Sequence, residues 1–226
     1  MNSCKYQSLG EMVLERLEKD HKVERNDIGT DALLKKSGFK FTTETYEIEN
    51  IGHLCILRMS GMLGLMHMET VVLSTVYKDS PLINLDRVMV MGKETMLAEL
   101  YDNMLTPLPK AYTEKLDTLK EKDGDLAEYV SGGEHWYDPI LLPCSYRKTG
   151  KKVAARFEEA AKNYFDAYVS QTDELSLCDK NAKTAKVRDF AEKLISNGGP
   201  AVNQVKKLFG DEVARRLILK HMYGVE

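Results

Sequence analysis

The pattern of apolar and polar positions changes twice along the chain. In residues 8–24, Met12, Val13 and Leu17 recur at helical spacing with charged residues between them, which predicts an amphipathic helix packed on one side of a flat layer. Residues 39–103 instead contain short runs rich in β-branched and aromatic residues, separated by Gly, Asn and Pro. This second pattern predicts a meander of about five strands.

Helical periodicity returns after residue 106. We predict a charged helix over residues 107–123, a loop over 124–139, one more strand at 140–146, and helices to the end of the chain with a break at Asn197-Gly198-Gly199-Pro200. Strands followed by helices indicate an α+β fold. The expected architecture is a three-layer α/β/α sandwich with a central antiparallel sheet, forming a single domain over residues 1–226.

Composition and charge narrow the classes of partner. Of the 226 residues, 43% are apolar and 30% are charged, which is ordinary for a globular protein. A formal net charge of -3 gives no overall basic field, so we expect no nucleic-acid partner. The apolar runs are too short to span a membrane, and residues 1–12 lack the apolar core of a secretory signal. We therefore expect a cytoplasmic protein without a membrane partner.

Few residues have the spacing of a cofactor or metal site. Cys4, Cys55, Cys144 and Cys178 are scattered and form no CxxC pair, so we expect free thiols and no metal site. The sequence also lacks GxGxxG, GxxxxGK[ST], HExxH and GxSxG. We therefore expect no bound redox cofactor held by a usual motif.

Two carboxylates interrupt neighbouring apolar strands. In a strand over 66–77, Glu69 shares a face with His67, Val71 and Leu73, and in the next strand Asp86 lies among Leu82, Asn84, Val88 and Val90. Burial raises the pKa of an unpaired carboxylate, so the two acids could deliver protons to one large flat ligand. The alternative is structural, with either acid paired to Arg58 or Arg87. A tight turn over 78–81 would place Glu69 about four residues from the level of Asp86.

The stretch METVVLSTVYKDSPLINLDRVMV resembles the ferredoxin-dependent bilin reductases. Pro81 takes the place of that family's turn proline, Asp86 that of its catalytic aspartate, and Glu69 the position of a histidine in the phycocyanobilin-forming members. The stretch HWYDPILLPC resembles a later motif of the family through Trp136, Asp138 and Cys144, and LFGDEVARRLILKHMYG resembles its closing segment. The resemblance covers roughly residues 40–224.

The sequence departs from the family at the turn, which is K-D-S-P instead of D-L-P, in its more basic and aliphatic final segment, and at two places that bear on the candidate site. Glu69 is more like the red chlorophyll catabolite reductases, relatives that use a glutamate with an aspartate on a linear tetrapyrrole. The family's N-D-K-T segment corresponds either to Asn197-Gly198-Gly199-Pro200, without its lysine, or to Asn181-Ala182-Lys183-Thr184.

The resemblance implies an oxidoreductase that reduces a bilin such as biliverdin by a radical mechanism. Single electrons would come from external reduced ferredoxin, with no bound cofactor or metal, and the basic run 147–152 would receive that acidic protein. Glu69 and Asp86 would be catalytic proton donors. Substrate-binding residues would be His67, Val71, Val88 and Asn197. Two alternatives remain, a non-catalytic tetrapyrrole or haem-binding protein with the same fold and a structural protein with both acids in salt bridges.

Overall fold

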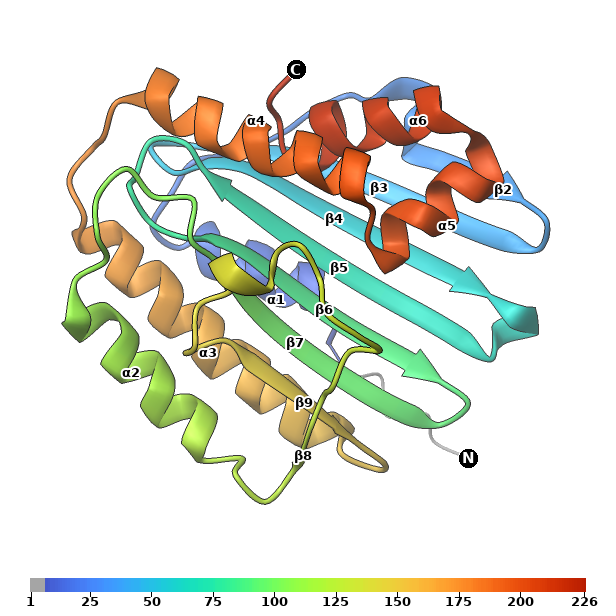
Figure 1. The fold of residues 1–226 in the computed structure, drawn as a ribbon, viewed down its shortest axis with the longest axis horizontal. Coiled ribbons are helices and arrows are strands. Elements are labelled where there is room, and N and C mark those ends of the chain that lie inside the picture. The colour runs from blue at the N-terminus through green and yellow to red at the C-terminus, as the bar shows by residue number, and fades with distance from the viewer. Residues whose placement is uncertain (1–6) are drawn as a thin grey trace.

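A computed structural model describes residues 7–226 and places the predicted meander at the centre of the molecule. The five strands pair in chain order, each antiparallel to the next, as the alternating apolar pattern predicts (Figure 1). They are β3 (Phe39–Ile48), β4 (Gly52–Gly61), β5 (Met66–Thr75), β6 (Leu82–Val90) and β7 (Lys93–Tyr101).

Four shorter strands extend the sheet at its edges. The full order is β1-β3-β4-β5-β6-β7-β9-β8, and β2 also pairs with β3. They are β1 (Val23–Arg25), β2 (Leu33–Lys36), β8 (Ala127–Glu128) and β9 (Tyr146–Gly150). The strand predicted at 140–146 is thus wrong in position, because residues 146–150 pair with β7 and carry the polar side chains typical of a sheet margin.

Helices α1 (Leu9–Leu17), α2 (Lys110–Glu121) and α3 (Ala154–Glu174) form the hydrophobic core on one side of the sheet. We call this side the α3 face. Its strand residues include Ile56, Val71, Leu73, Leu85 and Ala98. Helix α1 begins at Ser8, whose hydroxyl accepts from the backbone N–H of Glu11 while the Glu11 carboxylate accepts from that of Ser8.

The other side of the sheet is covered by α4 (Lys180–Asn197), α5 (Pro200–Phe209), α6 (Asp211–Arg216) and a π-helical turn η4 (Leu217–Met222). We call this side the α4 face. Its strand residues include Cys55, Leu57, Val72, Leu82 and Tyr101. The two helical layers confirm the predicted α/β/α sandwich. The last helix is broken where the periodicity suggested continuity, because Gly210 has a φ of 89° and separates α5 from α6. No helix within residues 7–226 has the length and apolarity needed to cross a membrane.

Candidate functional site

The sheet separates the two carboxylates that the sequence suggested would act together. Thr70 is the partner of Asp86 in the pairing of β5 with β6, and Glu69 is the partner of Arg87. The two acids are therefore one step apart in register, but alternation points Glu69 to the α3 face and Asp86 to the α4 face. The prediction that one ligand contacts both acids is wrong. Residues 76–81 form a longer loop between the strands, so the four-residue offset that a tight turn over 78–81 would give does not occur.

Glu69 is bound to the start of α1. Its carboxylate accepts from the backbone N–H groups of Leu9 at 2.8 Å and Gly10 at 3.1 Å, and from Nε of Arg58 at 3.0 Å. A helix N-terminus and a guanidinium both favour a negative charge. Glu69 therefore matches the structural alternative, because its oxygens are engaged in holding α1 on the sheet.

The residues predicted to bind the ligand are divided between different places. His67 is exposed on the α3 face, with its Nε2 2.9 Å from the carbonyl oxygen of Gly64, and Val71 is buried in the core beneath the helices of that face. Asn197 is exposed at the end of α4. Only Val88 of this group lines the same pocket as Asp86.

Asp86 opens into a pocket of about 200 Å³ between the α4 face and the helices above it. Aromatic side chains form much of its wall, from the sheet, the loop before β9, α4 and the end of the chain. They are Tyr101, Tyr129, Tyr137, Phe190 and Tyr223. The other polar residues of the lining are Thr70, Asn84, Asp86, Glu99, Ser131, His135 and Arg147. Apolar walls with a few convergent polar groups are typical of a small-molecule site.

Among the described residues, two neutral groups and no cation hold the carboxyl group of Asp86. The Thr70 hydroxyl donates to one oxygen, and the Asn84 amide donates to the other at 2.8 Å. Burial raises the pKa of Asp86 to about 7, and the nearby charge of Glu99 adds to that rise while the Thr70 hydrogen bond opposes it. The side chain is half-buried and meets the cavity, so an acid with a pKa near neutral faces the ligand space.

Glu99 forms a second polar centre in this pocket that the sequence did not reveal. It lies on β7 opposite Asn84 and accepts a hydrogen bond from the Tyr101 hydroxyl at 2.6 Å. Nε of Arg147 lies 3.0 Å from its other oxygen. Burial and the charge of Glu99 hold the pKa of Tyr101 well above its usual range. The signal was present in the run TMLAELY, where an acid again interrupts apolar positions.

The loop before β9 forms one wall of the pocket and is tied to the turn between α4 and α5. Nε1 of Trp136 donates to the carbonyl oxygen of Gly198 at 3.0 Å, and its ring lies 5.4 Å from that of Phe190. Tyr137 stacks on His135 with ring centroids 4.9 Å apart. All three residues of the resembling motif, Trp136, Asp138 and Cys144, lie outside the pocket lining. Asp138 accepts from the backbone N–H of His135 at the start of η3 (Asp138–Ile140), and Cys144 is buried in the core of the α3 face.

Lys183 does not line the pocket; it is a buried residue that stabilises the fold. Its side chain is fully buried in α4, and Nζ donates to the carbonyl oxygens of Ser80 at 2.8 Å and Asn103 at 3.1 Å. The Asp79 carboxylate lies 3.4 Å away and opposes the fall in the Lys183 pKa that burial causes. This lysine fixes the β5–β6 loop beneath the start of α4.

A larger hollow, about 620 Å³, lies on the α3 face beside the first residue of α3. Its lining includes Glu69, Arg58, Arg87 and Glu94, which are charged groups already engaged with one another in two ion pairs. The Asp86 pocket is smaller but combines aromatic walls with an acid of raised pKa. We therefore take the Asp86 pocket as the candidate site.

The remaining sequence predictions concern the basic run and the thiols. Residues 147–150 belong to a strand, in which Arg147 pairs with Glu99 and the buried Lys148 pairs with Glu128 at 2.7 Å, so only the end of the run is an exposed turn. Cys55, Cys144 and Cys178 are free thiols as predicted, and Cys4 lies outside the described residues. Within the described part of the chain, no group of three or more His, Cys, Asp or Glu side chains is arranged to hold a metal ion.

Comparison with known proteins gives a match at the level of the fold. No protein-family model matches the sequence, and no curated protein matches it. Among solved structures, the chain is similar to phytochromobilin synthase from tomato in complex with biliverdin, with a TM-score of 0.73 and 14% sequence identity. The likeness covers 96% of this chain and 83% of that one. The α/β/α sandwich that surrounds Asp86 is therefore the fold of an enzyme that has been crystallised with a linear tetrapyrrole.

Proposed function

We propose that this protein binds a linear tetrapyrrole in the Asp86 pocket and reduces it, with Asp86 as the proton donor. The observation that carries this proposal is the Asp86 carboxyl, which meets an aromatic-walled cavity with its pKa raised to about 7. A group with a pKa near the working pH is protonated often enough to donate and acidic enough to transfer its proton. The fold likeness to a biliverdin-bound enzyme supports the class of ligand.

The pocket lining suits such a ligand. The aromatic rings of Tyr101, Tyr137 and Phe190 offer faces and edges to an extended conjugated system. Among the described residues that line the pocket, Arg147 is the one lysine or arginine, and its guanidinium suits a ligand carboxylate. Pyrrole N–H groups are donors, and the carboxylate of Glu99 is a matching acceptor.

The reaction requires electrons from outside the protein. Saturating one double bond of a bilin takes two electrons and two protons. We propose that reduced ferredoxin or a similar acidic one-electron carrier delivers the electrons singly. Asp86 then protonates the radical formed after the first electron and is reprotonated from solvent. The second electron, from a second molecule of the carrier, and a second proton, again delivered through Asp86, complete the reduction. Thr70 and Asn84 keep its carboxyl oriented in both protonation states, because a hydroxyl and an amide can each donate or accept.

Ligand entry requires the pocket to widen. Its volume of about 200 Å³ lies below the roughly 300–1,000 Å³ of typical ligand sites. Helix α5 lies between Gly198-Gly199 and Gly210, and φ is 82° at Gly198 and 89° at Gly210. Glycines at both ends provide the backbone freedom for α5 to move away from the sheet. We expect this movement to accompany binding.

A non-catalytic tetrapyrrole-binding protein is the second candidate. The observation that favours it is the position of Glu69, which leaves the pocket without the second proton donor that the resemblance implied. Such a protein would change the absorption spectrum of biliverdin and would not consume reduced ferredoxin.

Two measurements test the proposal. Purified protein is titrated with biliverdin while the visible spectrum is recorded, and reduction is then followed anaerobically with reduced ferredoxin in single turnover. The variants are Asp86→Asn and, as a matched control, Glu69→Gln, one register step away on the other face. We expect wild type and both variants to bind biliverdin and only Asp86→Asn to lose reduction. No spectral change in wild type would refute the ligand class, binding without any reduction would favour the second candidate, and full activity of Asp86→Asn would remove its role as donor.

A further inference from the structure

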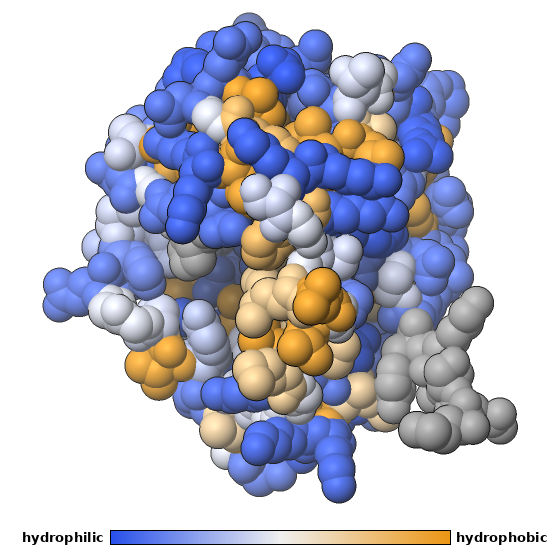
Figure 2. All heavy atoms as spheres, turned by 90° about the vertical axis from the view of Figure 1, so that its right-hand side faces the viewer, coloured by the Kyte–Doolittle hydropathy of each residue, from blue (hydrophilic) through white to orange (hydrophobic). Residues whose placement is uncertain are grey.

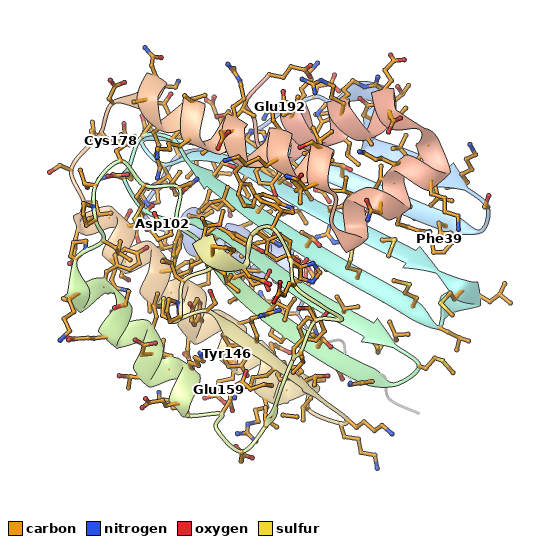
Figure 3. All side chains as sticks on the ribbon, in the orientation of Figure 1. Phe39, Asp102, Tyr146, Glu159, Cys178 and Glu192 are labelled. Carbon is orange, nitrogen blue, oxygen red and sulfur yellow. The ribbon has the colours of Figure 1, made fainter. Side chains whose placement is uncertain are left out.

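Four loops lie together at one end of the sheet. They are the β2–β3 turn (35–40), the β4–β5 connection with η2 (61–66, including Met62–Gly64), the β6–β7 turn (90–93) and the turn after β9 (149–153). Register places them side by side, since Lys40 pairs with Ser60, Met66 with Val90, and Glu94 with Gly150. We call this the hairpin end. It lies at the right of Figure 1, and Figure 3 marks it by Phe39, at the opposite side from Cys178.

The middle of the hairpin end is apolar and exposed. Relative exposure is 103% for Leu63, 74% for Met91, 55% for Leu65 and 47% for Met62. These side chains come from two adjacent loops, joined where the backbone N–H of Met91 donates to the carbonyl oxygen of Leu65 at 3.1 Å. Figure 2 shows apolar atoms gathered on this side of the molecule between hydrophilic ones. A contiguous exposed apolar patch on a protein marks an interaction surface.

The backbone of these loops is unfavourable for the residues it carries. Met62, Leu63 and Met91 have positive φ values of 51°, 55° and 49°. Such left-handed positions normally hold Gly, Asn or Asp, because other side chains collide with the backbone there. The β3–β4 turn at the other end of the sheet follows that rule with Asn50 at a φ of 60°. Large apolar side chains at three such sites therefore lower the stability of the fold, which indicates that they serve an interaction with another molecule.

The charge around the patch has one sign. The four loops contain six lysines and no aspartate or glutamate. The lysines are Lys35, Lys36, Lys40, Lys93, Lys151 and Lys152, and all are exposed. None of them forms an ion pair with any residue whose side chain the structure describes. This concentration contrasts with the net charge of -3 for the whole chain.

We propose that the hairpin end docks on an anionic lipid surface. Apolar tips surrounded by lysines match the two requirements of peripheral membrane binding, shallow burial of apolar side chains and attraction to acidic headgroups. A protein partner is the poorer match, because protein interfaces are depleted in lysine and enriched in Tyr, Trp, Phe, Met and Arg. The four loops share Met with such interfaces, but they contain six lysines and no Tyr, Trp or Arg. A membrane partner was not expected from the sequence because the apolar residues come from separate loops and form no spanning run.

Vesicle binding provides the test. The full chain is sedimented with vesicles of phosphatidylcholine alone and of phosphatidylcholine mixed with phosphatidylserine, at low and at high salt. We expect binding to the mixed vesicles, weakened by salt because the attraction is electrostatic. Leu63→Ser combined with Met91→Ser should weaken it by roughly tenfold or more through lost apolar burial. Leu177→Ser, at a residue 63% exposed at the other end of the sheet, is the control and should change nothing.

Charge is tested in the same assay. Replacing Lys35, Lys36, Lys151 and Lys152 by Gln should weaken binding by up to roughly 10³-fold, since each lysine near an anionic surface contributes about fivefold. Replacing four exposed lysines on or directly after α2 and on α3 (Lys110, Lys115, Lys122 and Lys162) changes the net charge equally and should have little effect.

Three results would overturn the proposal. The first is no preference of wild type for acidic vesicles. The second is equal binding by the Leu63/Met91 variant. The third is a Leu63/Met91 variant that loses affinity for ferredoxin, or changes the oligomeric state in solution, while vesicle binding stays unchanged; the hairpin end would then be a protein interface.

Discussion

Glu69 and Asp86 occupy nearly the same level of the sheet on opposite faces, yet their surroundings differ in almost every respect. Glu69 receives two backbone N–H groups from α1 and a guanidinium from Arg58. Within residues 7–226, Asp86 receives only the neutral donors Thr70 and Asn84, and another acid, Glu99, raises its pKa further. A carboxyl group thus holds a helix in place on the α3 face, as Glu69, and is an ionisable group beside a cavity on the α4 face, as Asp86.

The difference comes from what covers each face. On the α3 face, α1 begins directly over Glu69, so a helix terminus compensates the charge. On the α4 face, the helices and the loop before β9 approach from the sides and leave a cavity over Asp86. An acid in an apolar strand therefore gains its chemistry from the element packed above it, and alternation along the strand decides which element that is.

Substitutions of the two acids should differ most in their effect on the rate of bilin reduction. Asp86→Asn should lower the rate of bilin reduction by roughly 10²- to 10⁴-fold, because it removes the transferable proton while keeping the shape of the side chain. Glu69→Gln should change that rate less than about twofold, since its carboxylate faces the other core. Anaerobic single-turnover kinetics with both variants measures the contrast, and equal losses would abolish the distinction.

The second-largest effect should be on the pH dependence of stability, which should differ between wild type and Asp86→Asn. An aspartate in an unfolded chain titrates near 3.9, whereas Asp86 in the folded protein has a pKa of about 7. Between about pH 4 and pH 7, Asp86 is protonated in the folded protein and ionised in the unfolded chain. The stabilisation that its proton gives is therefore complete below about pH 4 and is lost as the pH rises through 7. The loss is on the order of 3 kcal/mol, after discounting for the part of the carboxyl that meets the cavity. Urea unfolding of wild type against Asp86→Asn, from about pH 4 to pH 8, should show curves that diverge as the pH rises.

Asp31 is the control of opposite sign for that experiment. The Arg216 guanidinium, hydrogen-bonded to it at 2.8 Å, lowers the pKa of Asp31 to about 2, and burial opposes this fall. Its contribution is present above about pH 4 and is lost as the pH falls toward 2, so Asp31→Asn should converge on wild type in acid. Parallel curves for wild type and Asp86→Asn would show that Asp86 has an ordinary pKa.

Glu69→Gln should be the more harmful change when stability is measured instead of turnover. The variant weakens two charge-assisted backbone hydrogen bonds and a half-buried ion pair, which together should lower the free energy of unfolding by about 2 kcal/mol near neutral pH. Glu18→Gln, an exposed acid at the end of the same helix, is the control and should change it by less than about 0.5 kcal/mol. Chemical unfolding followed by circular dichroism makes the measurement.

The smallest effect concerns the close approach of α1 to the sheet. A Cβ at Gly10 would lie 2.7 Å from Cγ2 of Ile56 and 2.8 Å from Nη2 of Arg58. Gly10→Ala should gain helix propensity but displace the N-terminus of α1 from Glu69, for a net loss of about 1 kcal/mol in unfolding free energy. A more stable Gly10→Ala protein would show that the contact between α1 and Glu69 adapts without cost.

The meander was predictable because each strand carries its own alternation and each turn its own Gly, Asn or Pro. The assignment of faces within a strand was also correct, as with Glu69 beside Val71 and Asp86 beside Val88. The relation between the strands was not predictable, since a one-residue change in register exchanges the faces. That register depends on the 76–81 loop, which Lys183 of α4 holds from about a hundred residues away.

The candidate site was predictable only in part for the same reason. Asp86 stands out as an acid in an apolar strand, but Glu99 and Arg147 meet it through strand pairing that no local pattern encodes. Glu69 stands out equally, and nothing in the sequence indicates that the first turn of α1 covers it. Asn197 was chosen by resemblance to a motif, and it ends α4 in an exposed position.

The order in which the two faces are covered matters while the chain is being synthesised. Helix α1 is made before the meander, but every helix of the α4 face follows residue 179. Once β7 leaves the ribosome, the sheet can form while Leu57, Val72 and Leu82 still face water. A nascent chain that pauses after β7 exposes an apolar surface to which chaperones or other chains can bind. The face that carries Asp86 is therefore the last to be protected, and the speed at which residues 180–225 are translated governs how long it stays open.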